Sequence, residues 1–236
     1  RKELKSRYKE RYGISSLLKK NNKKTMWIHA ASVGEFKSAD FFIETYYKKY
    51  NLLITTTTLS AAKYAESHYG NKIIHQFAPF DVSLWVKKFL SNWDPFFIIW
   101  IESDLWPATL DIIKKQKRKA ILVNARMSPN SFNRWKRIQL FYSDILICFS
   151  SIFAQSKLDQ QRINFLTKRN IKFIGNLKFV NKNIKSNKIL NLQSNKEEDT
   201  LTLMIANTHN DEESRLFPII KNLLDNNKNI RIIIAP

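Results

Sequence analysis

Short apolar runs alternate along most of the chain with longer segments in which apolar residues recur every three or four positions. The short runs predict strands at Met26–Ala31, Leu52–Thr57, Lys72–Ala78, Phe96–Ile101, Ala120–Asn124, Ile145–Phe149 and Ile171–Ile174. The longer segments predict helices at Phe36–Lys49, Ser60–Tyr69, Val82–Asn92, Leu105–Lys117, Phe132–Tyr142 and Lys157–Lys168. This alternation is typical of α/β proteins, so we predict a doubly wound parallel sheet.

The alternation is interrupted once, where Lys, Asn and Ser dominate and apolar residues become sparse. A strand, a helix and a strand then follow at Leu201–Ala206, Asp211–Leu224 and Ile230–Ala235. We therefore expect a basic segment over 1–24, an α/β domain over 25–176, a linker over 177–200 and the beginning of a second α/β domain over 201–236. The chain opens on a basic segment without Met and closes on a strand-like run, so we expect it to be a fragment of a longer protein.

Charge and cysteine content narrow the class of protein. The 40 Lys and Arg residues against 20 Asp and Glu give a net charge of +20, which attracts nucleic acid, anionic membranes or phosphorylated substrates. The single Cys148 excludes an internal disulfide framework and fits a reducing compartment. The sequence contains no Walker loop, Rossmann glycine triplet, zinc spacing or nucleophile elbow, and its four His residues are scattered.

Two carboxylates and a cation each follow a predicted strand. Glu35 comes after an apolar run, at the start of a helix, where an isolated acid is explained by the helix dipole. Glu102 follows another strand, and a third strand leads into Arg126. The carboxyl ends of parallel strands share one edge of the sheet, so these three residues could converge there. Two acids and a cation suit general-base chemistry on a hydroxyl group beside a bound anion.

Each supporting residue has a second interpretation. Glu102 either orients a ligand or holds a neighbouring cation, or it caps the helix that begins near Leu105. Arg126 either contacts a phosphate of the ligand or pairs with Glu102, because a guanidinium matches both oxyanions. The residues alone leave these alternatives open.

An ordered series of motifs resembles one known family. The motifs are Trp27–Glu35, Thr55–Thr58, Glu102–Pro107, Asn124–Arg126 with Ser128, Ala154–Ser156, Gly175–Lys178, and Thr208–His209 with Glu212–Glu213. Their order is similar to that of the 3-deoxy-D-manno-octulosonic acid (Kdo) transferases of lipopolysaccharide biosynthesis. The resemblance covers most of the chain and depends on several motifs in sequence rather than on one.

The resemblance implies a GT-B fold, with an amino-terminal acceptor domain and a carboxy-terminal domain for the donor CMP-Kdo. Glu35 takes the position of the catalytic base. The resemblance also assigns two further sets of residues. Ser32, Gly34, Glu102, Asn124 and Arg126 would bind or orient the acceptor, and His209, Glu212 and Glu213 would lie on the donor side.

The same resemblance implies the reaction partners and the location. We expect CMP-Kdo as donor, a lipid A precursor (lipid IVA) as acceptor and an anionic membrane surface, at the cytoplasmic face of a bacterial inner membrane. We expect neither a cofactor nor a metal, because helix N-termini and cationic side chains can stabilise a CMP leaving group. Family members usually carry a membrane anchor before such a basic stretch and continue beyond this terminus, so the fragment alone should be inactive.

Two rival interpretations belong to other classes. One is another GT-B glycosyltransferase that uses a different nucleotide sugar, such as a UDP-sugar. The other is a basic nucleic-acid-binding α/β protein, which the charge of +20 favours. No recognised nucleic-acid motif occurs in the chain, so we expect no nucleic acid among its partners.

Overall fold

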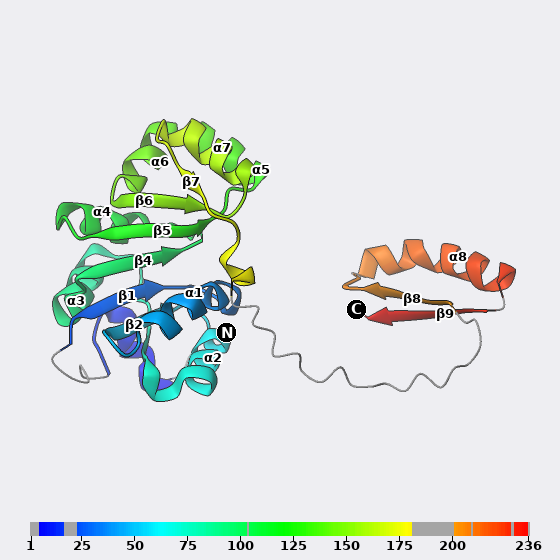
Figure 1. The fold of residues 1–236 in the computed structure, drawn as a ribbon, viewed down its shortest axis with the longest axis horizontal. Helices are drawn as coiled ribbons and strands as arrows, with labels where there is room; N and C mark the ends of the chain where they lie inside the picture. Colours follow the sequence, from blue (N-terminus) through cyan, green and yellow to red (C-terminus); the bar gives the residue numbers. More distant parts are fainter. Residues whose placement is uncertain are drawn as a thin grey trace. The chain divides into compact units, whose positions relative to one another are not determined.

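The computed structural model describes residues 5–16, 23–102, 104–180, 201–208, 210–227 and 229–235. The chain divides into two compact units, the first ending at residue 183 and the second beginning at residue 184. Each unit is an α/β structure with parallel strands (Figure 1). Within the described residues, no helix combines the length and the apolar character that a membrane span requires.

The first unit contains a seven-stranded parallel sheet in the order β3-β2-β1-β4-β5-β6-β7. Its strands are β1 (Thr25–His29), β2 (Asn51–Thr56), β3 (Ile74–Phe77), β4 (Phe97–Ile101), β5 (Ala120–Ala125), β6 (Phe149–Ala154) and β7 (Lys172–Phe173). Its α-helices are α1 (Val33–Tyr46), α2 (Leu59–Tyr69), α3 (Ser83–Trp93), α4 (Pro107–Lys115), α5 (Pro129–Lys136), α6 (Gln139–Leu146) and α7 (Lys157–Thr167). The strand order reverses between β1 and β4, which is the switch point of a doubly wound sheet. The predicted α/β fold is confirmed.

Helices cover both faces of this sheet. Trp27 and Trp100 point to one face and pack with α3, α4, α6 and α7, whereas Ile28 and Ile99 point to the other and pack with α1 and α2. Trp27, Trp93 and Trp100 are fully buried. Because a buried aromatic side chain removes about 150 to 250 Å² from water, this packing fixes the strands whose ends carry the candidate residues.

One predicted helix and one predicted strand are wrong. The helix expected over 132–142 is two helices, α5 and α6, because the backbone leaves helical geometry at Ile138 with φ −127° and ψ 44°. The rings of Trp135 and Tyr142 meet at 4.9 Å, whereas seven residues of straight helix would separate them by about 10.5 Å. The strand expected over 145–149 is the end of α6, and β6 begins only at Phe149. An apolar run of five residues is compatible with either structure.

The described part of the amino-terminal segment packs against edge strand β3. The 3-10 helix η1 (Lys5–Tyr12) places the fully buried Glu10 beside this strand, where its Oε2 accepts a hydrogen bond from the backbone N–H of Phe77 at 2.7 Å. Arg7 pairs with Glu10 at 2.7 Å and donates to the carbonyl of His75 at 2.8 Å. The segment therefore occupies an edge whose backbone groups would otherwise lack partners.

The chain returns across the carboxyl ends of the strands after β7. The yellow segment in Figure 1 contains the 3-10 helix η3 (Leu177–Phe179), which comes close to α1. Leu177 is buried in the cluster beneath α1. Residues 177–180, which the sequence analysis places at the start of the linker, thus pack on the first unit. The rest of that predicted linker, residues 181–200, lies outside the described residues.

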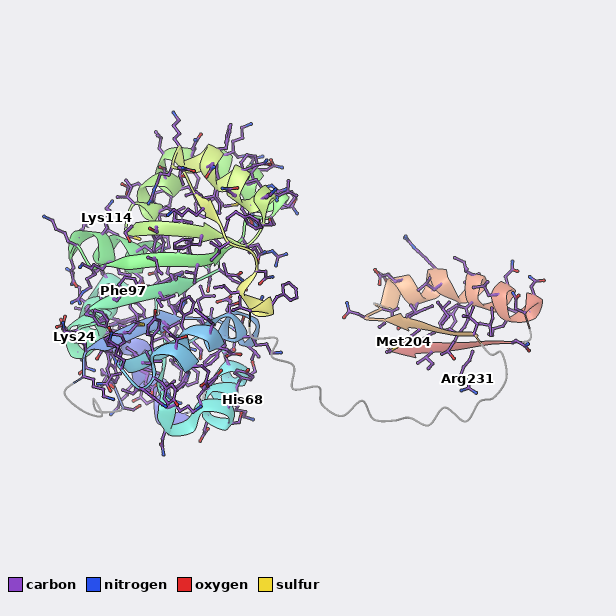
Figure 2. The ribbon with its side chains drawn as sticks, in the orientation of Figure 1. Lys24, His68, Phe97, Lys114, Met204 and Arg231 are labelled. Atoms are coloured by element: carbon purple, nitrogen blue, oxygen red, sulfur yellow. The ribbon has the colours of Figure 1, made fainter. Side chains whose placement is uncertain are left out.

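The two ends of the strands carry different residues. Figure 2 labels Lys24, Phe97 and Lys114, which lie at the amino ends of the strands and at the close of α4. Glu35, Glu102 and Asn124 belong to the opposite, carboxyl ends. We call this carboxyl edge around β1, β4 and β5 the rim.

The second unit contains β8 (Leu201–Ala206), α8 (Asn210–Asn226) and β9 (Ile230–Ala235). Its two strands pair in parallel from Leu201 with Ile230 to Ala206 with Ala235, and α8 connects them (Figure 1). The predicted strand, helix and strand of a second α/β unit are confirmed. Figure 2 labels Met204 on β8 and Arg231 on β9.

Candidate active site

The corner after β1 fixes Glu35 at the start of a helix. Ser32 is the N-cap of α1, and its Oγ accepts a hydrogen bond from the backbone N–H of Glu35 at 3.3 Å. The Glu35 carboxylate reaches back in turn, since its Oε2 accepts from the backbone N–H of Ala31 at 2.6 Å. This reciprocal arrangement resembles a capping box and holds a half-buried carboxylate at the positive end of the helix. Sequence reasoning places Glu35 at this turn correctly.

The corner after β4 places Glu102 on the other side of the switch point. Its backbone has a φ of 63°, in the left-handed region that non-glycine residues rarely occupy. Its carboxylate pairs with the ammonium of Lys178 at 2.6 Å and accepts from Asn124 Nδ2 at 3.2 Å. Glu102 does not cap α4, because Asp81 accepts the hydrogen bonds from Ala108 N and Thr109 N there.

Asn124 joins three parts of the rim. The residue is fully buried and has a φ of 55°, which asparagine tolerates better than most residues do. Its Nδ2 lies 3.2 Å from Glu102 Oε1 and 3.4 Å from Ser38 Oγ on α1, while its Oδ1 accepts from the backbone N–H of Leu177 at 3.1 Å. The amide group is thus engaged within the protein, where it fixes the positions of the rim segments.

Lys178 is a rim residue that sequence reasoning does not select. It follows the buried Leu177 in η3, so the packing of Leu177 brings its ammonium to Glu102. Its Nζ also lies 3.8 Å from the position that a Cβ on Gly34 would take. The signal in the sequence is the motif Gly175–Lys178, which belongs to the family resemblance but carries no assigned role there.

Arg126 is exposed, and Glu102 forms its ion pair with Lys178 rather than with Arg126. The sequence leaves open whether Arg126 pairs with Glu102, and the structure gives that position to Lys178 instead. Among the described residues, Arg126 has neither an ion pair nor a hydrogen bond through its side chain. Its guanidinium is therefore accessible from solvent beside the end of β5.

Burial makes Glu35 a much weaker acid than an exposed glutamate. Desolvation raises the pKa of its carboxyl from the ordinary value to about 7. The Ala31 N–H lowers the pKa, the charges of Glu102 and Asp104 raise it, and the Lys178 ammonium lowers it. A carboxylate with this pKa can both accept and release a proton near neutral pH.

His29, the last residue of β1, is a buried neutral histidine next to the corner that carries Glu35. Burial lowers the pKa of His29 to about 3, so its imidazole is uncharged at neutral pH. Its Nδ1 lies 2.9 Å from Thr55 Oγ1, and its ring packs on Trp100 with centroids 4.1 Å apart and on Trp106 at 4.9 Å. His29 is therefore a buried, uncharged residue that ends β1 and packs on two tryptophan rings.

The donor-side residues of the sequence analysis belong to the second unit. Glu213 accepts a hydrogen bond from Thr208 Oγ1 at 2.7 Å, across the start of α8, and Glu212 is exposed in the first turn of that helix. His209 lies outside the described residues. Across the parts of the chain that the structure describes, no three His, Cys, Asp or Glu side chains are grouped as a metal ion would require.

Comparisons with known proteins identify relatives along this whole region. The family model described as 3-deoxy-D-manno-octulosonic-acid transferase (kdotransferase) matches residues 6–181. The 3-deoxy-D-manno-octulosonic acid transferase of Rickettsia felis is 38% identical over 215 residues, which cover 89% of this chain and 46% of the relative. The corresponding protein of Rickettsia bellii is 36% identical over 235 residues, which cover 98% of this chain and 56% of the relative. The chain spans about half the length of these curated relatives.

Solved structures share the fold. A putative UDP-N-acetylglucosamine 2-epimerase from Listeria monocytogenes superposes with a TM-score of 0.60 at 10% sequence identity, over 90% of this chain and 62% of that one. At this identity the likeness concerns the fold alone, and it supports the GT-B type of α/β architecture that the family resemblance implies.

Proposed function

Because the chain belongs to the 3-deoxy-D-manno-octulosonic-acid transferase family, we propose that Glu35 is the general base of an inverting Kdo transfer. The donor is CMP-Kdo and the acceptor is a hydroxyl group of a lipid A precursor, lipid IVA. The observation that carries the proposal is the state of Glu35. Its carboxyl is half-buried at the rim, next to the switch point of the sheet, with a pKa of about 7.

The reaction follows from the movement of charge. A sugar hydroxyl is a poor nucleophile until a base within about 2.6 to 3.2 Å takes its proton. In the proposed step, Glu35 accepts that proton while the hydroxyl oxygen bonds to the anomeric carbon of Kdo. The bond from this carbon to CMP breaks, and its electron pair leaves with CMP. Attack from the face opposite CMP inverts the anomeric centre.

The neighbouring residues suit an acceptor that carries phosphate. We propose that Ser32 and Gly34 border the acceptor at the start of α1, where backbone N–H groups and the helix dipole favour anions. The exposed guanidinium of Arg126 is accessible to an acceptor phosphate, which it can bind bidentately. Glu102 and Asn124 orient the acceptor indirectly, by holding Lys178 and the segment around it beside Glu35.

The two units have separate roles in this proposal. Residues 25–176 form the acceptor domain, and residues 201–236 begin the donor domain, with His209, Glu212 and Glu213 on the donor side. Anionic headgroups at the cytoplasmic face of the inner membrane contact three basic residues in this proposal. These are Arg134 and Lys136 in the last turn of α5 and Arg137 at its C-cap. The reaction needs neither a metal nor a cofactor, because cations and helix N-termini receive the charge on CMP.

The proposal is tested with the complete gene product, CMP-Kdo and lipid IVA, with mass spectrometry of the lipid product. Glu35→Gln should lower the rate of Kdo transfer by about 10² to 10⁴, the usual value of general-base assistance. The matched control is Glu44→Gln, an exposed glutamate of the same helix that pairs with Lys72. It should transfer Kdo at the wild-type rate.

Three results would contradict the proposal. One is the absence of Kdo transfer by the wild type, and another is equal transfer by Glu35→Gln. The third is transfer from a UDP-sugar instead of CMP-Kdo, which would indicate a different glycosyltransferase. Salt-sensitive binding of RNA together with no transfer would favour a nucleic-acid-binding protein.

A further inference from the structure

The motif Thr55–Thr58 at the end of β2 uses each of its four hydroxyl groups differently. Thr55 Oγ1 accepts a hydrogen bond from Trp27 Nε1 at 2.8 Å and contacts His29, and Thr56 Oγ1 lies 2.9 Å from His75 Nε2. Thr58 caps α2 by accepting a hydrogen bond from Ala61 N at 3.2 Å. Thr57 Oγ1 donates a hydrogen bond to the Ala31 carbonyl at 2.8 Å. Only one of these contacts leads directly to the candidate base. That contact is the bond between Thr57 and Ala31.

Ala31 is held on both sides of its backbone. Its N–H donates to Glu35 Oε2 at 2.6 Å. Its carbonyl accepts two hydrogen bonds from the same residue, one from Thr57 N at 3.0 Å and one from Thr57 Oγ1 at 2.8 Å. The N–H and the carbonyl of Ala31 belong to the two peptide units on either side of its Cα. Because Thr57 holds the carbonyl twice, it restricts the backbone torsions at Ala31 and with them the direction of the N–H that Glu35 uses.

Thr57 is in turn fixed by the amino-terminal segment. Arg11 donates from Nη2 to the Thr57 carbonyl at 2.6 Å and from Nη1 to the Ala78 carbonyl at 3.1 Å. Its guanidinium also lies over the Phe77 ring, 4.9 Å from the centroid. Arg11 thus ties the carboxyl ends of β2 and β3 together, directly beside the corner that carries Glu35.

We propose that Thr57 is a positioning residue for Glu35, acting through the backbone of Ala31, with Arg11 as its anchor. The inference rests on the proposed function, because it concerns the base of that reaction. The Thr57 hydroxyl contacts neither the reacting atoms nor the carboxylate. It constrains the backbone of Ala31, whose N–H donates to the Glu35 carboxylate.

The physical consequence is a change in the acidity of Glu35. A hydrogen bond to a carboxylate stabilises its ionised form, and the Ala31 N–H has this effect on Glu35. Loss of the Thr57 hydroxyl should give the backbone torsions at Ala31 more freedom, weaken the hydrogen bond from its N–H and raise the pKa of Glu35 further. The other charged groups that act on Glu35 are Glu102 and Asp104 after β4 and Lys178 in η3, and they stay unchanged.

The discriminating variant is Thr57→Val, which keeps the shape of the side chain and removes the hydroxyl. Thr57→Ser restores the hydroxyl and should restore the wild-type behaviour. The matched control is Thr45→Val on α1, because Thr45 Oγ1 donates to the Phe41 carbonyl at 2.7 Å, a bond of the same kind on the same helix as Glu35. Thr45 is exposed near the other end of that helix.

The measurement is kcat/KM for Kdo transfer by the complete gene product between pH 5 and pH 9. In Thr57→Val we expect the acid limb to move up by about 0.5 to 1 pH unit, since one pKa unit is a tenfold change in the ionisation equilibrium. At pH 6 the variant should therefore be about three- to tenfold slower than wild type, and at pH 9 nearly equal. Thr45→Val and Thr57→Ser should keep the wild-type limb.

The outcomes separate this inference from the proposed function. If the wild type transfers Kdo and Glu35→Gln does not, but Thr57→Val has the limb of Thr45→Val, the positioning role of Thr57 is wrong and the function stands. A Thr57→Val variant that is equally slow at every pH would show a merely structural role and would also overturn the inference. Absence of transfer by the wild type would contradict the proposed function itself.

Discussion

The corners after β1 and after β4 look alike in the sequence but differ in the structure. Each is an apolar strand that leads into a glutamate before a helix. Glu102 forms an ion pair with the Lys178 ammonium at 2.6 Å and accepts a hydrogen bond from the Asn124 amide at 3.2 Å. Glu35 receives a backbone N–H at 2.6 Å, and its pKa rises to about 7. The corner after β4 compensates the negative charge of Glu102 with a cation, whereas the corner after β1 leaves Glu35 able to take up a proton near neutral pH.

The difference comes from residues that are distant in sequence. Asn124 and Lys178 both reach Glu102, one from the end of β5 and the other from η3. The partner of Glu35 belongs to its own corner and lies only four residues away. A local motif therefore identifies the position of a carboxylate, whereas its chemistry depends on which distant segments the fold brings to it.

The largest expected effect on stability comes from removing Asn124, the residue that assembles the β4 corner. Asn124→Ala removes the hydrogen bonds that the side-chain amide makes to Glu102, Ser38 and Leu177, and it places alanine at a φ of 55°. We expect the free energy of unfolding to fall by about 2 to 4 kcal/mol, measured by urea denaturation. Asn124→Gly tolerates the same backbone angle, so it should be more stable than the alanine variant by about 1 kcal/mol.

The exposed Asn133 of α5 provides the control for Asn124. Asn133→Ala should change the free energy of unfolding by less than about 0.5 kcal/mol, as is usual for surface sites. If Asn124→Ala were as stable as Asn133→Ala, the rim would not depend on the buried amide.

An intermediate effect separates the two corners by stability. Glu35 has a folded pKa of about 7, above its ordinary value of 4.5, so the folded state binds a proton that the unfolded state has already released. The resulting loss of stability grows as the pH rises from about 4.5 to 7 and is complete above pH 7. Glu35→Gln avoids this loss, so it should unfold at a higher temperature than the wild type at pH 8 and at nearly the same temperature at pH 4.5.

The size of that difference is limited by solvent. One pKa unit corresponds to about 1.4 kcal/mol, and partial exposure of Glu35 screens the effect, so we expect about 1 to 2 kcal/mol at pH 8. Glu44→Gln, at an exposed glutamate of the same helix, serves as the control for replacing a glutamate by glutamine. A Glu35→Gln variant that is less stable than wild type at pH 8 would indicate a carboxylate that is already compensated.

The smallest expected effect comes from replacing Lys178, which interacts with the glutamates of both corners. Its ammonium pairs with Glu102 and also lowers the pKa of Glu35. Lys178→Met should therefore raise the pKa of Glu35, and the acid limb of kcat/KM should move up by about 0.5 pH unit. Lys178→Arg retains the charge and should keep the limb in place. An unchanged limb in Lys178→Met would mean that the corners act independently.

Local patterns in the sequence were sufficient for the fold and for half of the candidate site. Six of the seven strands of the first unit, the place of Glu35 in the first turn of α1 and the start of α4 at Pro107 all follow from apolar spacing and helix-start signals. The break at Ile138 does not, because it depends on the tertiary packing of Trp135 against Tyr142. The strand β6 was missed at its true position because two serines follow Phe149.

The rest of the site required the three-dimensional structure. The ion pair of Glu102 with Lys178 joins residues 76 positions apart, and nothing in the spacing distinguishes Lys178 from the many other lysines of this basic chain. Pairing of Arg126 with Glu102 is a reasonable expectation for residues at the ends of neighbouring strands. The structure differs because the return of η3 across the rim brings Lys178 to Glu102 instead.

The central claim is that Glu35, rather than Glu102, is the base. The most direct test is the pH dependence of kcat/KM for Kdo transfer by the complete gene product, in the wild type, Glu35→Gln and Glu102→Gln. We predict a wild-type rate that rises with unit slope below a pKa of about 7, a Glu35→Gln rate lower by about 10² to 10⁴ without that limb, and a Glu102→Gln variant that retains the limb. A Glu35→Gln variant that keeps the wild-type rate and limb would contradict the account.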